Sequence, residues 1–359
     1  MRVLYTGNFR LFPADAAGRR VLALSDALKR AGHSVCLIPR LGYRQSHIVE
    51  YDTCVDFDYI LDNGTKFSWA RLIREAYSTS YSAIIAYNPS NLLALLVRLI
   101  SSLRGTNAVL DLTEWYEYAH LPSFRSKAEV FLRMNATYRL FSRMIFISEY
   151  LASCYRPAIG RIIPPLVSAT PLKAPRHTFD RNGPLKILYA GFPGQKDRID
   201  RLILWLEQVE LPFPVQLILA GPRPDQINAV GSNGFEIVSL GPVHRQKVFE
   251  LYQECHLSAI IRDDARYEWA GFPTKSVESW SFGVPILVMS HSRFAKSALQ
   301  YGAAVAIDEV DPVASLENTL KRIYFDEGCL AQLSESALRL TQERHLVTNY
   351  VSTMEEIVS

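Results

Sequence analysis

The sequence predicts an α/β protein made of two doubly wound domains. Short apolar segments alternate with amphipathic segments along its 359 residues, which is the pattern of a parallel sheet covered by helices. The alternation stops once, in a proline-rich stretch near the middle of the chain, and then starts again. The length suits two domains of about 100 to 200 residues each. A composition of 48% hydrophobic and 21% charged residues is that of ordinary globular proteins.

The first half predicts a parallel sheet with its helices. Its expected strands are 2–7, 33–40, 82–90, 108–116 and 144–150. A helix is expected in 16–32, where Gly32 ends it. A second helix, in 91–103, contains Arg98 and is too short to cross a bilayer, so a core helix is favoured over a surface that touches membrane. Residues 1–165 are the predicted first domain.

The second half repeats the pattern after a linker that we place at 166–184. The expected strands are 185–191, 215–221, 236–241, 257–262, 285–290 and 303–307. Residues 185–340 are the predicted second domain, and 341–359 a last helix. Ligands of doubly wound sheets bind at the carboxyl ends of the strands, so two such domains are expected to face a central cleft.

The cysteines and the N-terminus indicate a cytoplasmic protein. The cysteine count is odd and no CxxC pair occurs, which argues against a disulfide framework and a structural zinc site. The chain enters a strand directly, without the apolar region of a signal peptide, and no segment has 18 consecutive apolar residues.

Neither domain carries the fingerprint of a dinucleotide-binding enzyme. The first turns read TGNFRLFPADAAGRR and AGFPGQKDRIDR, and neither contains GxGxxG. A dehydrogenase is therefore disfavoured.

Residues 270–288, AGFPTKSVESWSFGVPILV, predict a helix followed by a buried strand. Pro273 suits the first helical position and Gly283 the position just past the last. The amino end of a helix attracts anions such as a diphosphate, Gly271 permits close approach, and Lys275 adds a full charge. Glu278, one turn deeper, can accept hydrogen bonds from the vicinal diol of a ribose. A surface pair between Lys275 and Glu278 is the alternative.

The same segment resembles the donor-binding element of the family-4 retaining glycosyltransferases of GT-B fold, of the bacterial cell-surface polysaccharide type. Other pieces of the chain follow the order of that family. They are AAGRRVLALSDALKRAGHSV, LDLTEWYEY, FISEYLASCYR, IIPPLV, YAGFPGQKD and ERHLVTNYVSTMEEIV. The resemblance covers nearly the whole chain, and it implies that the last helix crosses back to the N-terminal domain.

The resemblance implies a donor site in the second domain. Glu278 matches the second glutamate of an E-x7-E motif and would hold the ribose. The first glutamate is absent, because Ala270 stands there and Glu268 lies two places away. Lys196 matches a basic residue that meets the diphosphate, and Arg262 is the candidate substitute for an arginine replaced by Phe192. The full set of expected donor-binding residues is Gly18, Arg19, Gly191, Lys196, His244, Arg262, Gly271, Phe272, Pro273, Thr274, Lys275 and Glu278.

In the first domain, the resemblance places Gly18 and Arg19 near the diphosphate and Glu114 where many members have a histidine. Glu114 would orient the acceptor hydroxyl or the sugar, and Glu114, Lys196 and Arg262 are the expected catalytic residues. Trp115 offers an apolar face for a sugar ring. Asp111 is expected to be structural.

The function that the resemblance implies is transfer of a sugar, with retention, from a nucleotide diphosphate sugar to a glycan or polyprenyl-diphosphate-linked glycan. No cofactor, metal or nucleic acid is expected. Glycosyltransferases of the GT-A fold hold a divalent metal with acidic residues, and such residues occur here in the DFD sequence at 56–58 and at 263–264. We interpret both segments as solvated loops. Two alternatives stay open: a sugar-nucleotide epimerase or hydrolase of the same fold, and an inactive nucleotide-sugar-binding protein.

Charge points to an anionic partner of the first domain. Residues 1–165 contain 20 Lys and Arg against 13 Asp and Glu, a balance of +7, which leaves −4 for the rest of a chain whose net charge is +3. Arg125, Lys127, Arg133, Arg139 and Arg143 punctuate an apolar helical pattern in 124–143. Such a helix is expected to rest on anionic lipid or meet an anionic acceptor, with a solvated face as the alternative. The expected location is the cytoplasm, peripherally at the inner face of the membrane.

Overall fold

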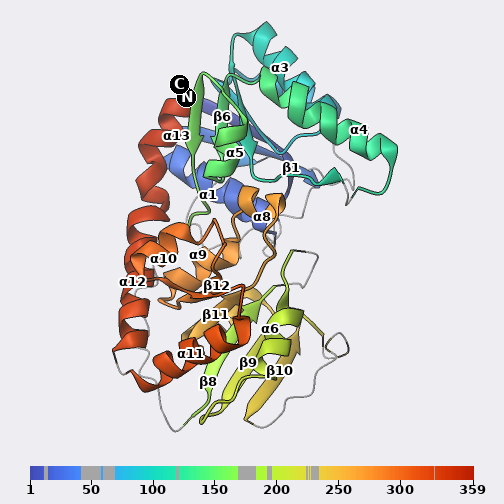
Figure 1. Ribbon diagram of the computed structural model, residues 1–359. Helices are drawn as coiled ribbons and strands as arrows, with labels where there is room; N and C mark the ends of the chain where they lie inside the picture. Colours follow the sequence, from blue (N-terminus) through green and yellow to red (C-terminus); the bar gives the residue numbers. More distant parts are fainter. Residues whose placement is uncertain are drawn as a thin grey trace. The chain divides into compact units, whose positions relative to one another are not determined.

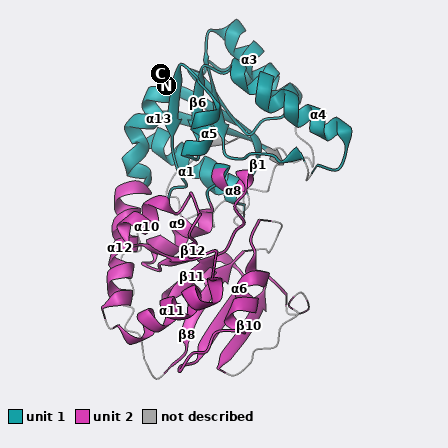
Figure 2. Ribbon diagram, viewed as in Figure 1, with its two compact units in different colours: residues 1–168, 270–272, 346–359 teal, residues 169–269, 273–345 magenta. Residues whose placement is uncertain are grey.

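The computed structural model describes residues 1–11, 15–41, 58–59, 69–118, 121–168, 183–191, 196–223, 225, 227, 234–326 and 328–359. The chain divides into two compact units (Figure 2). Unit 1 consists of Met1–Ser168, Ala270–Phe272 and Leu346–Ser359, and unit 2 of Ala169–Trp269 and Pro273–His345. Each unit is an α/β domain with its own parallel sheet, as the alternation of segments predicts.

Unit 1 contains a seven-stranded sheet of order β3-β2-β1-β4-β5-β6-β7, drawn in Figure 1. Its strands are β1 (Arg2–Arg10), β2 (Ser34–Leu41), β3 (Asp58–Tyr59), β4 (Ala83–Tyr87), β5 (Asn107–Leu112), β6 (Arg143–Phe146) and β7 (Ile159–Ile162). Its helices are α1 (Ala16–Arg30), α2 (Trp69–Ser78), α3 (Asn91–Arg104), α4 (Phe124–Leu132), α5 (Glu149–Cys154) and α13 (Val351–Val358). All pairings between these strands are parallel.

Alternate residues of β1 supply the two cores of unit 1, because successive side chains of a strand point to opposite faces. Val3 and Tyr5 pack with α1 and α13, whereas Leu4 packs with α2 and α3. All three side chains are fully buried. Helices therefore cover both faces of the sheet.

Unit 2 contains a six-stranded parallel sheet of order β10-β9-β8-β11-β12-β13. Its strands are β8 (Leu185–Ala190), β9 (Val215–Ala220), β10 (Phe235–Gly241), β11 (Leu257–Ile260), β12 (Ile286–Met289) and β13 (Ala304–Ile307). Its helices are α6 (Ile199–Leu206), α7 (Arg245–Glu254), α8 (Arg266–Ala270), α9 (Thr274–Ser281), α10 (Lys296–Tyr301), α11 (Pro312–Phe325) and α12 (Cys329–Arg344), and only the last residue of α8 belongs to unit 1. Ile187 of β8 packs with α6 and α11, and the next residue, Leu188, packs with α7.

Two predicted helices differ from the structure. The pattern in 124–143 is α4, a π-helical turn (Arg133–Thr137), a 3-10 turn (Tyr138–Leu140) and then strand β6, which begins at Arg143. Arg133 is buried rather than on a lipid-facing surface, and its guanidinium lies 4.4 Å from the centre of the Tyr116 ring. The C-terminal segment is likewise not one helix, because α12 ends at Arg344 and a 3-10 turn (Val347–Tyr350) precedes α13.

Candidate functional site

The sheet of unit 2 has a switch point between its central strands, β8 and β11. The chain moves from β8 towards β9 and β10 on one side, and from β11 towards β12 and β13 on the other. Loops that leave the carboxyl ends of such strands diverge and open a crevice. Asp197 follows β8 and Arg262 follows β11, so both residues lie where a ligand of this fold is held.

Asp197 brings two of the predicted cations together. Its carboxylate lies 2.6 Å from Nζ of Lys275 and 2.8 Å from Nε of Arg262, and it accepts a hydrogen bond from the Tyr189 hydroxyl at 3.1 Å. Burial alone would raise the pKa of Asp197, but the two cations outweigh burial and lower the pKa to about 2. Burial lowers the pKa of Lys275, against the opposing effect of Asp197. The cluster has two cations, one carboxylate and a net positive charge.

Gly191 makes room for the Lys275 ammonium. A Cβ built at Gly191 would lie 2.9 Å from Nζ of Lys275, and its φ of +150° is unfavourable for other residues. Lys275 also lies over the ring of Tyr189, 4.2 Å from its centre. The glycine, the aromatic ring and Asp197 together fix the position of the ammonium group.

The start of α9 presents both Lys275 and Glu278. Pro273 is the residue before the helix rather than its first residue, and its carbonyl accepts hydrogen bonds from the backbone and hydroxyl of Ser276. Thr274 is the first residue of the helix. Lys275 is bound to Asp197, whereas Glu278 lies 3.9 Å from the guanidinium of Arg245. The alternative of a surface pair between Lys275 and Glu278 is therefore wrong.

His244 lies beside this arrangement in sequence. It is the exposed residue before α7, directly ahead of Arg245. Arg245 was not predicted, because an arginine at the start of a helix is ordinary in a sequence. Its approach to Glu278 links the first turn of α7 to α9.

A second carboxyl group adjoins Arg262. Glu268 is fully buried, and neither of its oxygens pairs with a side chain among the described residues. Burial raises its pKa to about 7, against the smaller effects of Arg262, His291 and the Arg293 backbone. Such a group is partly neutral at pH 7, which is rare for a glutamate.

Arg262 is held at both of its ends. The guanidinium is bound to Asp197, while the Arg262 carbonyl lies 3.0 Å from Nε2 of His291. Nδ1 of the same ring is bound to Glu309. The two contacts hold the His291 ring between the Arg262 carbonyl and Glu309.

The remaining residues predicted for the donor site have different surroundings. Lys196 is exposed and precedes Asp197. Gly271 is half-buried, and Phe272 packs with a core of unit 1 together with Ala270, which is fully buried. The Ala270 carbonyl accepts a hydrogen bond from Ser148. Phe192 lies outside the described residues.

In unit 1, Gly18 and Arg19 lie in the first turn of α1, which Asp15 caps by accepting a hydrogen bond from the backbone of Ala17. Gly18 is buried and Arg19 half-buried. The next residue, Arg20, is buried and bound to Asp111 at 2.8 Å. The interpretation of Asp111 as structural agrees with this ion pair and with its hydrogen bond from Tyr5.

Glu114 follows the carboxyl end of β5 and is half-buried. The preceding residue, Thr113, is tied to Asn88 by two hydrogen bonds, which fixes this part of the chain. Burial and Glu114 both raise the pKa of Tyr116, which donates a hydrogen bond to Glu114. Trp115 packs on the ring of Tyr150.

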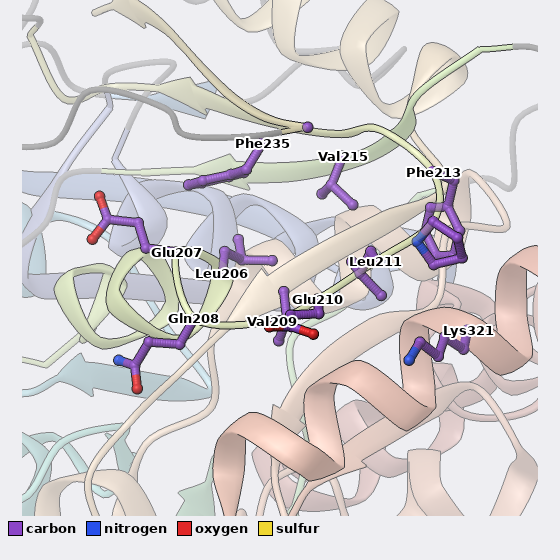
Figure 3. A pocket seen from close by; sticks show the side chains of 12 residues that line it. Leu206, Glu207, Gln208, Val209, Glu210, Leu211, Phe213, Val215, Phe235 and Lys321 are labelled. Atoms are coloured by element: carbon purple, nitrogen blue, oxygen red, sulfur yellow. The ribbon is translucent and has the colours of Figure 1, made fainter.

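A hollow of about 710 Å³ lies elsewhere in unit 2 (Figure 3). Val215 and Phe235, which line it, are the first residues of β9 and β10, so it lies at the amino ends of the strands. Asp197 and Arg262 follow the carboxyl ends. The hollow is therefore separate from the candidate site.

The described residues contain neither a metal-binding cluster nor a membrane-spanning helix. They contain no cluster of three or more His, Cys, Asp or Glu side chains placed to hold a metal ion. Asp56 and the side chain of Asp58, both in the DFD sequence, lie outside the described residues. No helix in the described ranges has the length and apolar character to cross a membrane.

Comparisons with known proteins identify the fold. The chain matches no protein-family model and no curated protein sequence. Among solved structures, it is similar to HepE from Anabaena in complex with UDP, with a TM-score of 0.69, 14% identity and 99% of both chains covered. It is also similar to sucrose-phosphate synthase from Thermosynechococcus elongatus, with a TM-score of 0.73, 13% identity and 99% and 98% covered.

A glycosyltransferase from Rickettsia africae is a third similar structure, with a TM-score of 0.68, 12% identity and coverage of 100% of this chain and 98% of that one. HepE has also been crystallised with UDP-glucose. The predicted GT-B fold, with two Rossmann-like domains, is confirmed by these similarities.

Proposed function

We propose that the chain is a glycosyltransferase. It moves a sugar, with retention of anomeric configuration and without a divalent metal, from a nucleotide diphosphate sugar to a glycan or lipid-linked glycan. The observation that carries the proposal is the convergence of Arg262 and Lys275 on Asp197 at the switch point of unit 2.

The chemistry of the donor suits this cluster. When the sugar leaves, negative charge grows on the diphosphate, and fixed cations in a water-poor site stabilise that charge. Lys275 and Arg262 are fixed in this way, because their side chains are 13% and 9% exposed and both are held by Asp197. The net positive charge that remains is available to the diphosphate, and Lys196 adds a cation at the surface.

The rest of the donor is assigned to neighbouring groups. Glu278 takes hydrogen bonds from the ribose hydroxyls, since it lies on α9 one turn after Lys275 and a carboxylate accepts hydrogen bonds. His244 and the turn before α7 meet the base. The UDP and UDP-glucose complexes of HepE support a nucleotide sugar as the co-substrate.

We assign the acceptor to residues 1–165 and the donor to residues 185–340. Glu114 orients the acceptor hydroxyl or the sugar, while Gly18 and Arg19 approach the diphosphate. Residues 166–184 are the linker, and 341–359 the segment that returns to the N-terminal domain. The acceptor is a glycan or a polyprenyl-diphosphate-linked glycan, and the enzyme acts in the cytoplasm at the inner face of the membrane.

The experiment that tests the proposal has two stages. Thermal-shift measurements with UDP, GDP, ADP, dTDP and CMP sugars first identify the donor, because a bound ligand raises the melting temperature. Incubation of that donor with candidate glycans, followed by NMR of the product anomer, then tests transfer and retention. Release of free sugar without transfer would favour a hydrolase, a changed donor sugar would favour an epimerase, and binding without any turnover would favour an inactive binding protein.

A further inference from the structure

Exposed apolar side chains gather on three helices of unit 1. Among the described residues, 17 large hydrophobic side chains are exposed, and ten of them belong to α2, α3 and α4. These ten are Trp69, Ile73, Tyr77, Leu92, Leu95, Leu99, Leu103, Phe124, Phe131 and Leu132. Single exposed apolar residues are normal in soluble proteins, but a concentration of this kind marks an interaction surface.

The centre of the surface is a row of leucines on α3, which we call the leucine stripe. Leu92, Leu95, Leu99 and Leu103 are 63%, 46%, 57% and 66% exposed. At about 100° per residue, the four positions fall within roughly 80° of one another on the helix. The opposite face of α3, with Val97 and Ile100, is buried against the sheet. A helix that is apolar on its solvent face as well as on its core face is expected to be covered by a partner.

The charged residues of α3 itself have one sign. The sequence of α3 contains Arg98 and Arg104 and no acidic residue. The Arg98 guanidinium lies over the ring of Phe141, 5.9 Å from its centre, and that of Arg104 lies 5.8 Å from the centre of the Tyr77 ring. The two arginines thus extend from α3 towards different neighbours.

The neighbouring helix α2 has the same character. Trp69, Ile73 and Tyr77 recur every four residues and are exposed, while Leu72 and Ala76 between them are buried. The acid of α2 is Glu75, and its carboxylate is bound to Thr79 and Tyr81. The arginines of α2 are Arg71 and Arg74.

We propose that the leucine stripe, with the exposed face of α2, docks on an anionic phospholipid membrane. Leucines that enter the acyl boundary, aromatic rings at the headgroup level and arginines that pair with lipid phosphates are the three components of an interfacial membrane contact. The excess of four arginines over one acid on α2 and α3 favours this occupant over a second copy, since like charges would face each other in a symmetric dimer. α3 has 14 residues and lies along the membrane plane rather than across it.

This inference deepens the proposed function, because it assigns the membrane contact to α2 and α3 instead of the basic pattern in 124–143. The inference rests on the proposed function only for the purpose of the membrane contact, which is to bring a lipid-linked acceptor near the enzyme. The contact itself does not depend on the donor site, so the two can be tested separately.

The test is flotation of the full chain with vesicles of phosphatidylcholine, with and without 30% phosphatidylglycerol, over a salt series. Wild type is expected to float with the anionic vesicles at low salt. The double variant Leu95→Gln/Leu99→Gln should lose about tenfold or more of its partitioning, because two apolar side chains no longer enter the boundary. Arg98→Gln/Arg104→Gln should bind less at low salt and respond less to added salt.

Matched controls separate the surface from general effects of charge and hydrophobicity. Leu204, on α6 of unit 2, is 54% exposed, so Leu204→Gln should float like wild type. Arg156, which is exposed between α5 and β7, is the control for charge, so Arg156→Gln should respond to salt like wild type. Unchanged melting temperature and nucleotide-sugar binding would show that each variant is folded.

Three results would overturn the proposal. The first is that wild type does not float at low salt. The second is that it floats and the leucine substitutions do not reduce flotation. The third is that the protein binds no vesicles but sediments as a dimer, which the leucine substitutions dissociate. A protein that floats but binds no nucleotide sugar would instead contradict the proposed function and leave the membrane contact standing.

Discussion

Nζ of Lys275 lies 2.6 Å from a carboxylate oxygen of Asp197, although the two residues are 78 positions apart in the sequence. The ion pair joins the loop after β8 to the first turn of α9, and Arg262 completes it from the loop after β11. A buried carboxylate holds the buried Arg262 and the half-buried Lys275 in fixed positions but neutralises only one of the two cations. This relationship is the basis of the proposed diphosphate site.

Replacing Asp197 with asparagine should destabilise the protein. The change leaves Lys275 and Arg262 facing each other without a counter-ion, and breaking one partner of a buried ion pair costs about 3 to 5 kcal/mol. Because the folded-state pKa of Asp197 is lowered to about 2, its ionised form contributes stability above pH 4 that is lost as the pH falls towards 2.

Urea denaturation at pH 7 measures the change in the free energy of unfolding. The matched control is Asp200→Asn, whose side chain is 59% exposed in its ion pair with Arg198 and should change stability by less than about 1 kcal/mol. Equal effects of the two variants would mean that the Asp197 cluster does not hold the loops together.

Glu278→Ala should weaken donor binding by about tenfold to a hundredfold, since charge-assisted hydrogen bonds of about 1.5 to 3 kcal/mol to the ribose are lost. Calorimetry with the nucleoside diphosphate and with its 2′,3′-dideoxy analogue isolates the contribution of the ribose hydroxyls. The variant should lose affinity for the first ligand and retain that for the second. An equal loss for both would place Glu278 away from the ribose.

Glu268 should make stability fall between pH 4.5 and pH 8. Its folded-state pKa is raised to about 7, so the folded protein holds a proton that the unfolded chain releases near pH 4.5. The stability that this proton contributes is full below pH 4.5 and is lost as the pH rises through 7, by a total of about 3 kcal/mol.

Melting temperatures across this range test the pH effect. Glu268→Gln, which stays neutral, should flatten the profile, whereas Glu254→Gln, an exposed control, should leave it as in wild type. A wild-type profile that is already flat would contradict the raised pKa.

Transfer activity should survive EDTA, because Lys275, Arg262 and Lys196 supply the positive charge that a divalent ion supplies in other enzymes. Lys196→Ala should lower turnover more than Lys196→Arg, which keeps the charge. Complete loss of activity in EDTA with recovery in Mn²⁺ or Mg²⁺ would show that a metal is required and would bring the DFD sequence back into consideration.

The fold was predictable because the strands are apolar and are separated by turn residues. The segments 185–191, 215–221 and 257–262 each contain the strand that the structure forms. Residues 124–143 predict one helix because their apolar spacing is helical throughout, whereas the structure changes to π and 3-10 turns after Leu132 and buries Arg133. Local periodicity contains no information about contacts with residues that are distant in the sequence, such as Tyr116.

The candidate site was predictable only in part. The sequence points to Lys275 and Arg262 but not to Asp197, because an aspartate after a lysine is an ordinary loop residue until the sheet brings β8 and β11 together. In the sequence, Glu268 is only the acid two positions before Ala270, the place where the motif has a glutamate. Its burial depends on packing around α8, which no spacing in the sequence indicates.

The central claim is that Lys275 and Arg262 bind the diphosphate of the donor, and a calorimetric titration with a nucleoside, its monophosphate and its diphosphate tests it most directly. The base is the one identified by the thermal-shift panel. The affinity of wild type should increase from the nucleoside to the monophosphate and from the monophosphate to the diphosphate. Lys275→Met should abolish most of the gain from nucleoside to diphosphate and leave nucleoside binding unchanged, while Lys247→Met, on the exposed face of α7, should behave as wild type. A diphosphate gain that persists in Lys275→Met and in Arg262→Met would contradict the account.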